Sequence, residues 1–315
     1  MSHNTHRAFW IPVLAIFTIS LLGFCLAPEA DKGTEELSTP NSRKEFNAYW
    51  YAGKAEITTY DLEQARYGEI HPGKSVMVFV TEDFLINEQV KKEQVSDKPA
   101  TSVIKLNKID RFTTGIYDYS TMLSTFTPVD RYSYPFSLKT TFSSQDWCGQ
   151  SFMQVNRRGE GYQALVRSYF EAEGDKNVIL DSSLLEDEIW TLARLDPMAL
   201  PQGDITIIPS SQQFRLRHQP LAPVEAEAKM TLQVRDDSSE QYIYTVDFES
   251  GRQLKIFMQS VFPYRIYGWE EKVKSGFGTE AQWLTTKATM DKSIKSSYWG
   301  QNNKADAELR ESLGL

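Results

Sequence analysis

One cysteine and two histidines of this chain could form a nucleophilic catalytic pair. Cys148 is the cysteine expected in the folded part, and His71 and His218 are the histidines expected there. A thiolate that a neighbouring imidazole activates can attack a carbonyl carbon. A hydrolase that uses Cys148 with His71 or His218 is therefore one hypothesis for this protein.

Each of these three residues also has a purely structural interpretation. Cys148 can be a small buried apolar residue. His71 precedes Pro72-Gly73, which is typical of a turn at a hairpin tip. His218 is in phase with the apolar residues of a predicted strand over 214–218, so we expect it to point inward.

Two acidic clusters are the other candidates for chemistry, as metal ligands or paired carboxylates. Glu186-Asp187-Glu188 falls in the first turn of a predicted helix, where negative charge complements the helix dipole. Glu171, Glu173 and Asp175 fall at a strand end followed by a turn, and their spacing is not that of a calcium loop. We interpret both clusters as structural, and we predict no metal and no cofactor.

The composition excludes several classes of protein. Among 315 residues the chain has 42 acidic and 34 basic residues, a net charge of -8, so we predict no binding to nucleic acid. Two cysteines are too few for a disulfide framework or a four-cysteine zinc site. The sequence also lacks the P-loop, Gly-x-Ser-x-Gly, His-Glu-x-x-His and Cys-x-x-Cys motifs.

The N-terminal segment predicts export. From Phe9 to Ala27 no residue is charged, and Arg7 precedes this stretch, as in a signal peptide or an uncleaved membrane anchor over residues 1–27. Cys25 stands near the end of the stretch, with Leu22 three residues ahead, so it is a candidate for lipidation. We expect a location in the cell envelope, either periplasmic or anchored to a membrane.

The remainder divides into a tether and one folded domain. Residues 28–41 are rich in Glu, Ser, Thr, Pro and Lys, and they predict a flexible tether. Residues 42–315 have the length and pattern of a single β-rich domain. A capping box at 42–45 predicts a helix that opens the domain, and a second one at 183–186 predicts a helix that Pro197 ends. A third helix is expected over 303–313.

Between these helices the apolar residues alternate with period two. The clearest run is 225–235, where apolar and polar residues alternate without a break. Turn residues separate it from similar runs, and the predicted strands are 55–62, 76–80, 103–109, 162–170, 205–208, 214–218, 225–235, 244–248, 254–258, 264–269 and 283–290. We predict a mainly β fold, in which a many-stranded antiparallel sheet curls into an open barrel or sandwich with a few covering helices.

Five segments resemble those of an uncharacterised exported bacterial family whose members are often labelled "septum formation inhibitor Maf". The segments are AYWYAGKAEI at 48–57, ARYGEIH at 65–71, SYFEAEGD at 168–175, LEDEIW at 185–190 and FPYRIYGWEE at 262–271. The resemblance implies export but no catalytic role. True Maf proteins are cytosolic nucleotide pyrophosphatases with a Ser-x-Ser-Pro-Arg-Arg motif, which this chain lacks, so their activity is not expected. Residues 262–290 are also similar to the closing strands of periplasmic lipoprotein carriers, whose sheet wraps around a helix.

These features favour an exported, membrane-tethered binding or carrier protein of the bacterial envelope. Its 7 Trp, 15 Tyr and 17 Phe could line a cavity in the curved sheet for an apolar or lipid-like ligand. The alternatives are the Cys148 hydrolase and a structural envelope protein that binds another protein.

Overall fold

The computed structural model describes residues 40–171 and 173–315. The predicted signal or anchor over 1–27, with Cys25, lies outside the described residues, as does the predicted tether up to residue 39. Among the residues that are described, no helix is long and apolar enough to cross a membrane.

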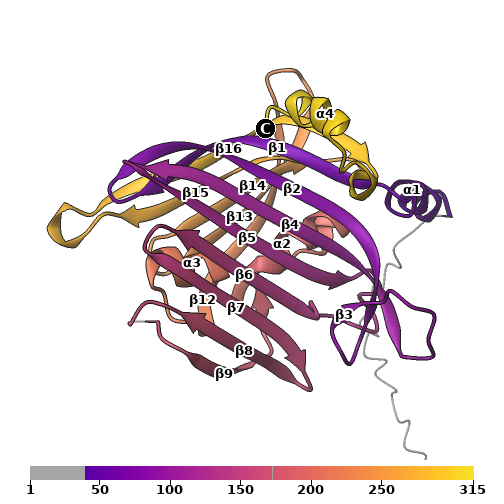
Figure 1. Cartoon of the computed structure of the whole chain (residues 1–315), viewed down its shortest axis with the longest axis horizontal. Coiled ribbons are helices and arrows are strands. Elements are labelled where there is room, and N and C mark those ends of the chain that lie inside the picture. The colour runs from indigo at the N-terminus through magenta and orange to yellow at the C-terminus, as the bar shows by residue number, and fades with distance from the viewer. Residues whose placement is uncertain (1–39, 172) are drawn as a thin grey trace, which may run out of the picture.

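One mixed sheet of sixteen strands dominates the described part of the chain, which confirms the predicted fold class (Figure 1). The strand order is β10-β11-β12-β13-β14-β15-β16-β1-β2-β4-β5-β6-β7-β8-β9, with β3 paired to β2. Neighbours are antiparallel except β10 and β11. The strands are β1 Ala55–Arg66, β2 Glu69–Leu85, β3 Val90–Lys91, β4 Ala100–Thr114, β5 Tyr117–Pro128, β6 Lys139–Asp146, β7 Gly149–Arg158, β8 Gly161–Ser168, β9 Lys176–Asp181, β10 Leu184–Leu185, β11 Gly203–Ile208, β12 Val224–Val234, β13 Glu240–Phe248, β14 Gln253–Gln259, β15 Ile266–Ser275 and β16 Gln282–Ser296.

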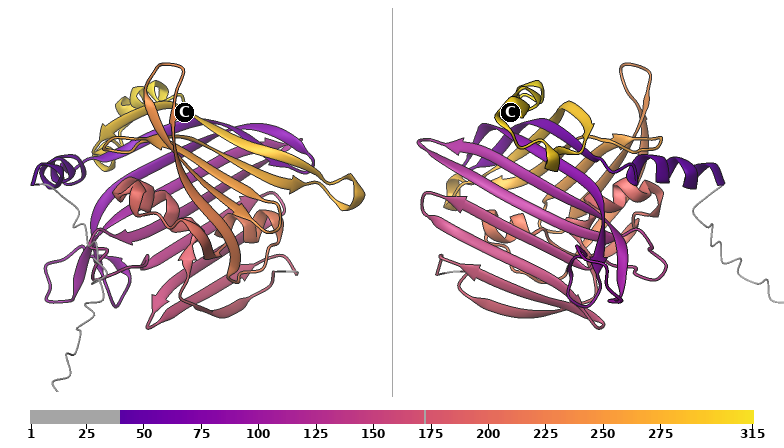
Figure 2. Two further views of the ribbon diagram at one scale, coloured as in Figure 1. Left: turned by 180° about the vertical axis from the view of Figure 1, so that it is seen from behind. Right: turned by 45° about the vertical axis from the view of Figure 1, so that its right-hand side comes forward.

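The sheet curls until its two edges approach each other at one corner. β9 and β10 form opposite edges, yet only Ser182 and Ser183 separate them in the chain. Three Cα steps span no more than about 11 Å, so the ends of the two edge strands must lie close together. The sheet is therefore an open barrel around an interior (Figure 2).

Helices occupy both faces and one end of this sheet. Helices α2 (Ile189–Leu195) and α3 (Ser211–Arg217) lie on the concave side (Figure 2), where α2 contacts β4 and β5 and α3 contacts β6. Helix α4 (Ala307–Ser312) lies on the convex side, where the following residue, Leu313, packs on β1 and β2. Helix α1 (Pro40–Trp50) begins two residues before the predicted capping box and buries Trp50 in the main core.

The predicted strand over 214–218 is wrong, because this segment is helix α3. Ser210 caps the helix, since its hydroxyl accepts a hydrogen bond from the backbone N–H of Gln212. The helix lies inside the curled sheet, and Gln213, Phe214, Arg215 and Leu216 are all buried. Because polar and apolar residues are buried alike, the segment shows no helical stripe in its sequence.

Strands β5, β6, β7 and β9 are absent from the sequence-based prediction. The inward positions of β5 alternate between apolar residues and threonines, and Thr121, Thr125 and Thr127 are buried. Their hydroxyls bond to the helical layer: Thr125 donates to the Asp187 carbonyl at 3.0 Å, and Thr127 lies 2.6 Å from the Thr191 hydroxyl. Buried hydroxyls break the apolar alternation that reveals a strand.

Candidate functional site

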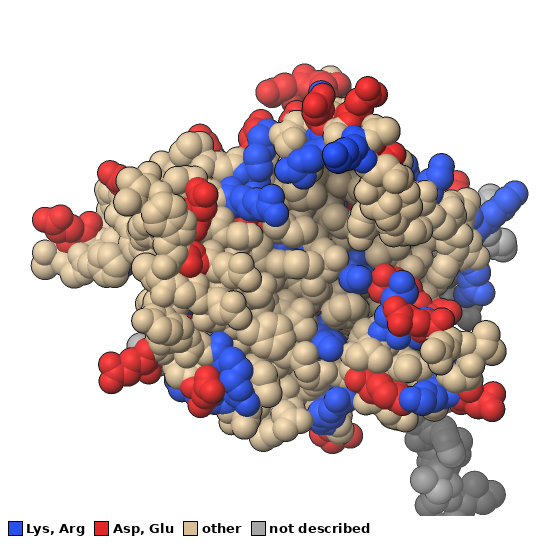
Figure 3. All heavy atoms as spheres, in the orientation of Figure 1, with Lys and Arg blue, Asp and Glu red and all other residues tan. Residues whose placement is uncertain are grey.

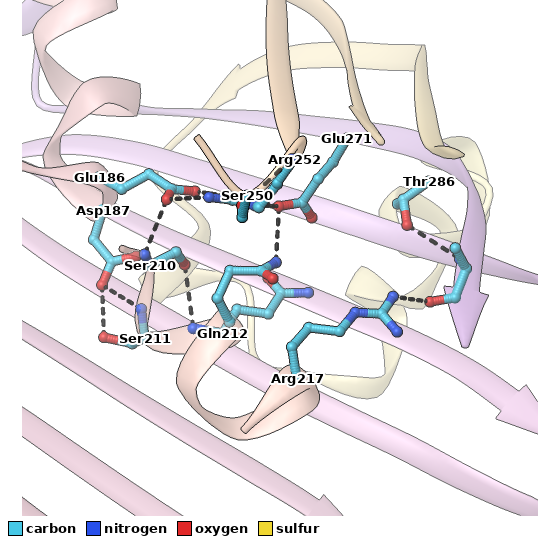
Figure 4. A network of polar contacts seen from close by, with 12 residues as sticks. Glu186, Asp187, Ser210, Ser211, Gln212, Arg217, Ser250, Arg252, Glu271 and Thr286 are labelled. Carbon is cyan, nitrogen blue, oxygen red and sulfur yellow. Dashed lines mark hydrogen bonds and ion pairs between the residues drawn. The ribbon is translucent and has the colours of Figure 1, made fainter. Parts of the chain in front are cut away.

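A network of buried ionic side chains joins α3 to the sheet inside the barrel (Figure 4). The guanidinium of Arg252, at the start of β14, lies between the carboxylates of Glu186 and Glu271. Its Nη1 is 2.7 Å from Glu186 Oε2, and its Nε is 2.8 Å from Glu271 Oε1. Gln213 of α3 also donates to Glu271, and the backbone of Ser210 donates to Glu186. These contacts fix α3 beneath the sheet.

The acidic triplet lies in the helical turn that leads into α2, close to the predicted first turn of a helix. Glu186, Asp187 and Glu188 form a 3-10 turn before α2, and all three are buried. Glu188 accepts hydrogen bonds from the backbone N–H groups of Leu185 and Ser137. The capping box predicted at 183–186 is wrong, because Glu188 is the carboxylate that binds the preceding backbone.

Asp187 makes the stability of the protein depend on pH. Its Oδ2 accepts two hydrogen bonds from Ser211, whereas its Oδ1 is buried without a partner among the described residues. Burial raises the pKa of Asp187 above its ordinary value of 3.8. The unfolded chain therefore releases this proton at a lower pH than the folded chain, so ionisation of Asp187 destabilises the fold as the pH rises above about 4.

We expect the Asp187→Asn variant to lose this pH dependence. Its free energy of unfolding, relative to the wild type, should rise by at least about 1 kcal/mol between pH 4 and pH 8, measured by chemical denaturation. Asp204→Asn is the matched control, because Asp204 is exposed on β11. A difference between Asp187→Asn and wild type that stays constant over this range would contradict the assignment.

The barrel holds a first large cavity, here called the apolar cavity. Its volume is about 770 Å³, within the range of about 300–1,000 Å³ of small-molecule sites. It lies between α1, α2, β11 and the loops after β5 and β14. Its walls include Phe46, Val129, Phe136, Leu192, Ile205 and Phe262.

Two cationic residues, Arg43 and Arg131, line the apolar cavity beside these apolar walls, and of the two Arg43 is exposed and Arg131 half-buried. Arg131 donates to the carbonyl of Pro135, and its Nη1 is buried without a hydrogen-bond partner among the described residues. Burial lowers the pKa of Arg131, and the nearby carboxylate of Glu188 opposes this. The cavity thus combines a wide apolar wall with a positive charge that has a free donor.

A second cavity, here called the arginine cavity, has a volume of about 720 Å³. It lies between the end of β1, α3 and the start of β14. Four arginines line it together with an aromatic rim: Arg66, Arg215, Arg217, Arg252, Phe277 and Trp283. On the face in Figure 3, charges of both signs are mixed round the margin and few occur in the middle.

Cys148 and His218 both line the arginine cavity, but no hydrogen bond joins them. Cys148 is exposed in the turn between β6 and β7, so the interpretation as a buried residue is wrong. His218 ends α3 in the left-handed conformation, with φ of 54°, and its Nδ1 lies 3.0 Å from Glu173 Oε1. The expectation of an inward-facing strand histidine is wrong too. The thiol itself has no hydrogen-bond partner among the described residues.

His71 lies inside β2 and not at a hairpin tip. The turn between β1 and β2 is at Tyr67-Gly68, and both residues have positive φ, at 53° and 83°. His71 is paired with Gln64 across the two strands, and its Nε2 lies 3.1 Å from the carbonyl oxygen of Arg66. We therefore interpret His71 as a buried strand residue that stabilises the β1–β2 turn, and not as a catalytic partner of Cys148.

The second acidic cluster is only partly hydrated. Glu173 is buried, accepts a hydrogen bond from Ser168 at 2.6 Å, and pairs with Arg215 at 3.6 Å. Glu171 and Asp175 are exposed or half-buried. In residues 40–171 and 173–315, no three His, Cys, Asp or Glu side chains are arranged to hold a metal ion.

The sequence-based candidates omit the arginines, which are the residues that the fold brings together. Arg66 is at the end of one strand, Arg215 and Arg217 are on α3, and Arg252 begins β14. In the sequence, the one indication of this arginine cluster was the segment Arg215-Leu216-Arg217-His218, in which the two arginines occupy alternate positions.

The fold and its cavities define a class of protein: a mainly β protein whose one many-stranded sheet curls over short helices, with two ligand-sized cavities. No protein-family model, curated protein or solved structure matches the chain. The resemblances carried by segments 48–57, 65–71, 168–175, 185–190 and 262–271 therefore remain predictions.

Proposed function

We propose that this protein is an exported, membrane-tethered binding or carrier protein of the bacterial envelope that holds an apolar or lipid-like ligand in its apolar cavity. The observation that carries this proposal is a cavity of about 770 Å³ with largely apolar walls between α1, α2, β11 and the loops after β5 and β14. Burial of apolar surface contributes about 25 cal/mol per Å², so an acyl chain or a ring system of matching size would gain several kcal/mol there.

The position of Arg131 in the cavity wall favours a ligand that has one polar end. Its unpartnered Nη1 can donate to a carboxylate or phosphate oxygen at the wall of the cavity, while the apolar body contacts Phe136 and Leu192. Glu188, the carboxylate nearest in the wall, already accepts two backbone hydrogen bonds. The sequence of residues 1–41 adds the expected signal and tether, which would hold such a protein at a membrane.

Binding to the apolar cavity is measurable with N-phenyl-1-naphthylamine, an uncharged probe whose fluorescence rises in apolar surroundings. We expect Val129→Trp to raise the dissociation constant of the probe at least about tenfold, because the indole fills part of the cavity. Val129 is half-buried in the loop after β5 and packs against the core.

Val95→Trp is the matched control, since Val95 is fully exposed. This variant should bind the probe as the wild type does. Equal affinity of the wild type and Val129→Trp would contradict the proposal, as would the absence of probe binding. Native mass spectrometry of the full chain, purified gently from its own membranes, then identifies a co-purifying lipid and the mass of the N-terminus.

A further inference from the structure

Two of the four arginines in the arginine cavity have no carboxylate partner. Arg252 pairs with Glu186 and Glu271, and Arg215 pairs with Asp146 and Glu173. Among the described residues, no carboxylate oxygen lies within 4.0 Å of the guanidinium of Arg66 or Arg217. Arg66 is only 6% exposed, so its positive charge is buried and uncompensated.

The backbone holds these two guanidinium groups in a reciprocal arrangement. Arg66 donates to the carbonyl of Leu216, the residue before Arg217, and Arg217 donates to the carbonyl of Ala65, the residue before Arg66, at 2.5 Å. The Nε of Arg66 is left buried without a partner. The pKa of Arg217 is lowered to about 10, chiefly by burial and also by the positive charges of Arg66 and Arg252, against the attraction of Glu271.

A neutral ligand would not compensate the positive charges of Arg66 and Arg217. An uncompensated buried charge is destabilising, and a second like charge nearby adds repulsion. An anion bound between the two groups would receive charge-assisted hydrogen bonds from both, in the planar geometry that guanidinium offers to carboxylate and phosphate. Although Asp146, Glu225 and Glu249 also line the cavity, none of them pairs with Arg66 or Arg217, so these two groups remain open to a bound negative charge.

Tyrosine hydroxyls surround the guanidinium of Arg66; burial raises the pKa of Tyr119, whereas the pKa of Tyr67 shifts in the opposite direction. The hydroxyls of Tyr67 and Tyr119 lie 2.7 Å apart, and Nη2 of Arg66 is 3.2 Å from the first and 3.4 Å from the second. Burial raises the pKa of Tyr67, but hydrogen bonds with Tyr117 and Tyr119 and the charge of Arg66 outweigh it, so this pKa is lowered overall.

Aromatic side chains continue the site outward. The ring of Phe277 stacks on that of Tyr67, with centroids 5.8 Å apart, and Phe277 is 73% exposed. Trp283 is also exposed and lines the same cavity. Exposed aromatic rings beside a buried charge fit a ligand that joins an anionic group to an apolar or aromatic body.

We propose that the arginine cavity binds an organic anion, whose phosphate, carboxylate or sulfonate group lies between Arg66 and Arg217 and whose apolar body lies against Phe277 and Trp283. This site is separate from the apolar cavity, with which it shares no lining residue. The proposal for the arginine cavity does not depend on whether the apolar cavity binds a lipid.

The test compares two probes that differ in one charged group. The anionic probe is 1-anilinonaphthalene-8-sulfonate, and N-phenyl-1-naphthylamine is the same ring system without the sulfonate. We expect Arg66→Gln and Arg217→Gln to weaken binding of the anionic probe at least tenfold and to leave the uncharged probe unaffected. Arg111→Gln, which removes an exposed arginine of β4, should change neither. Arg217→Lys, which keeps the charge, should bind with intermediate affinity.

Competition distinguishes a soluble anion from the headgroup of a lipid. Phenyl phosphate and dodecyl phosphate are each titrated against the sulfonate probe, with sodium chloride at equal ionic strength as the blank. Displacement at lower concentration by phenyl phosphate assigns the site to a small aromatic anion, and displacement at lower concentration by dodecyl phosphate assigns it to an amphiphile. Displacement by neither beyond the salt blank overturns the proposal.

Cys148 gives a readout that needs no arginine variant. Its exposed thiol lines the arginine cavity, so bound phenyl phosphate or dodecyl phosphate should slow its alkylation by iodoacetamide several-fold in the full wild-type chain. Peptide mass spectrometry separates Cys148 from Cys25. An alkylation rate that neither phosphate changes, together with sulfonate binding that is the same in Arg66→Gln and wild type, would refute an anion site here.

Discussion

Replacement of Arg252 by methionine is expected to lower the free energy of unfolding by about 3–5 kcal/mol, because it leaves two buried carboxylates without their counter-charge. Arg252 is 9% exposed and donates to both Glu186 and Glu271. Those carboxylates also hold Ser210 and Gln213, so the substitution should loosen α3 as well. Urea denaturation followed by tryptophan fluorescence measures the change.

Two further variants distinguish two causes of the lower stability of Arg252→Met: the loss of ion pairs and the loss of packing. Arg111→Met removes an exposed arginine, so its stability should stay within about 0.5 kcal/mol of the wild type. Glu186→Gln in the Arg252→Met background should recover part of the loss, since it removes one unpaired carboxylate. A double variant as unstable as the sum of its single variants would show that the ionic pairing is not the cause.

Replacement of Trp50 by alanine is the second large effect, also about 3–5 kcal/mol. Trp50 is 1% exposed and joins α1 to the sheet. Its ring packs against Phe79 at 6.4 Å, and the guanidinium of Arg194, held by Glu56, lies 5.1 Å from its centroid. Loss of the indole leaves a cavity at this junction.

The Trp50→Ala variant also tests whether α1 is a wall of the apolar cavity. Phe46 and Tyr51, on and beside this helix, line that cavity, so a loosened α1 should raise the dissociation constant of N-phenyl-1-naphthylamine. Trp299→Ala removes a half-exposed indole near the C-terminus and should alter neither property. Unchanged probe binding in a destabilised Trp50→Ala variant would mean that α1 anchors the fold without closing the cavity.

Strands with large apolar residues on one face could be predicted from the sequence. In β14, Leu254, Ile256 and Met258 point inward and the residues between them are half-buried. In β13, Tyr244, Val246 and Phe248 are buried in the same way, but in β12 only Ala226 and Ala228 are buried, while Leu232 and Val234 are exposed. The predicted meander at 225–258 is confirmed as three paired strands. Alternation of this kind is a local property, because neighbouring side chains of a strand lie on opposite faces whatever the rest of the chain does.

The helical layer could not be predicted in the same way. Helix α3 is buried among polar partners: Arg215 donates to Asp146, Gln213 to Glu271 and Ser211 to Asp187. A burial pattern that depends on these partners cannot be read from local hydropathy. The threonines of β5 were missed for the same reason.

The sequence alone determined the mainly β class, the opening helix and the lack of common catalytic motifs, since these follow from local composition and spacing. The tertiary structure decided where the charges meet. Arg66 and Arg217 are 151 positions apart, yet each binds the backbone beside the other. The curl of the sheet brings the end of β1 onto α3, and only that long-range packing places the buried guanidinium of Arg66 near the half-buried one of Arg217.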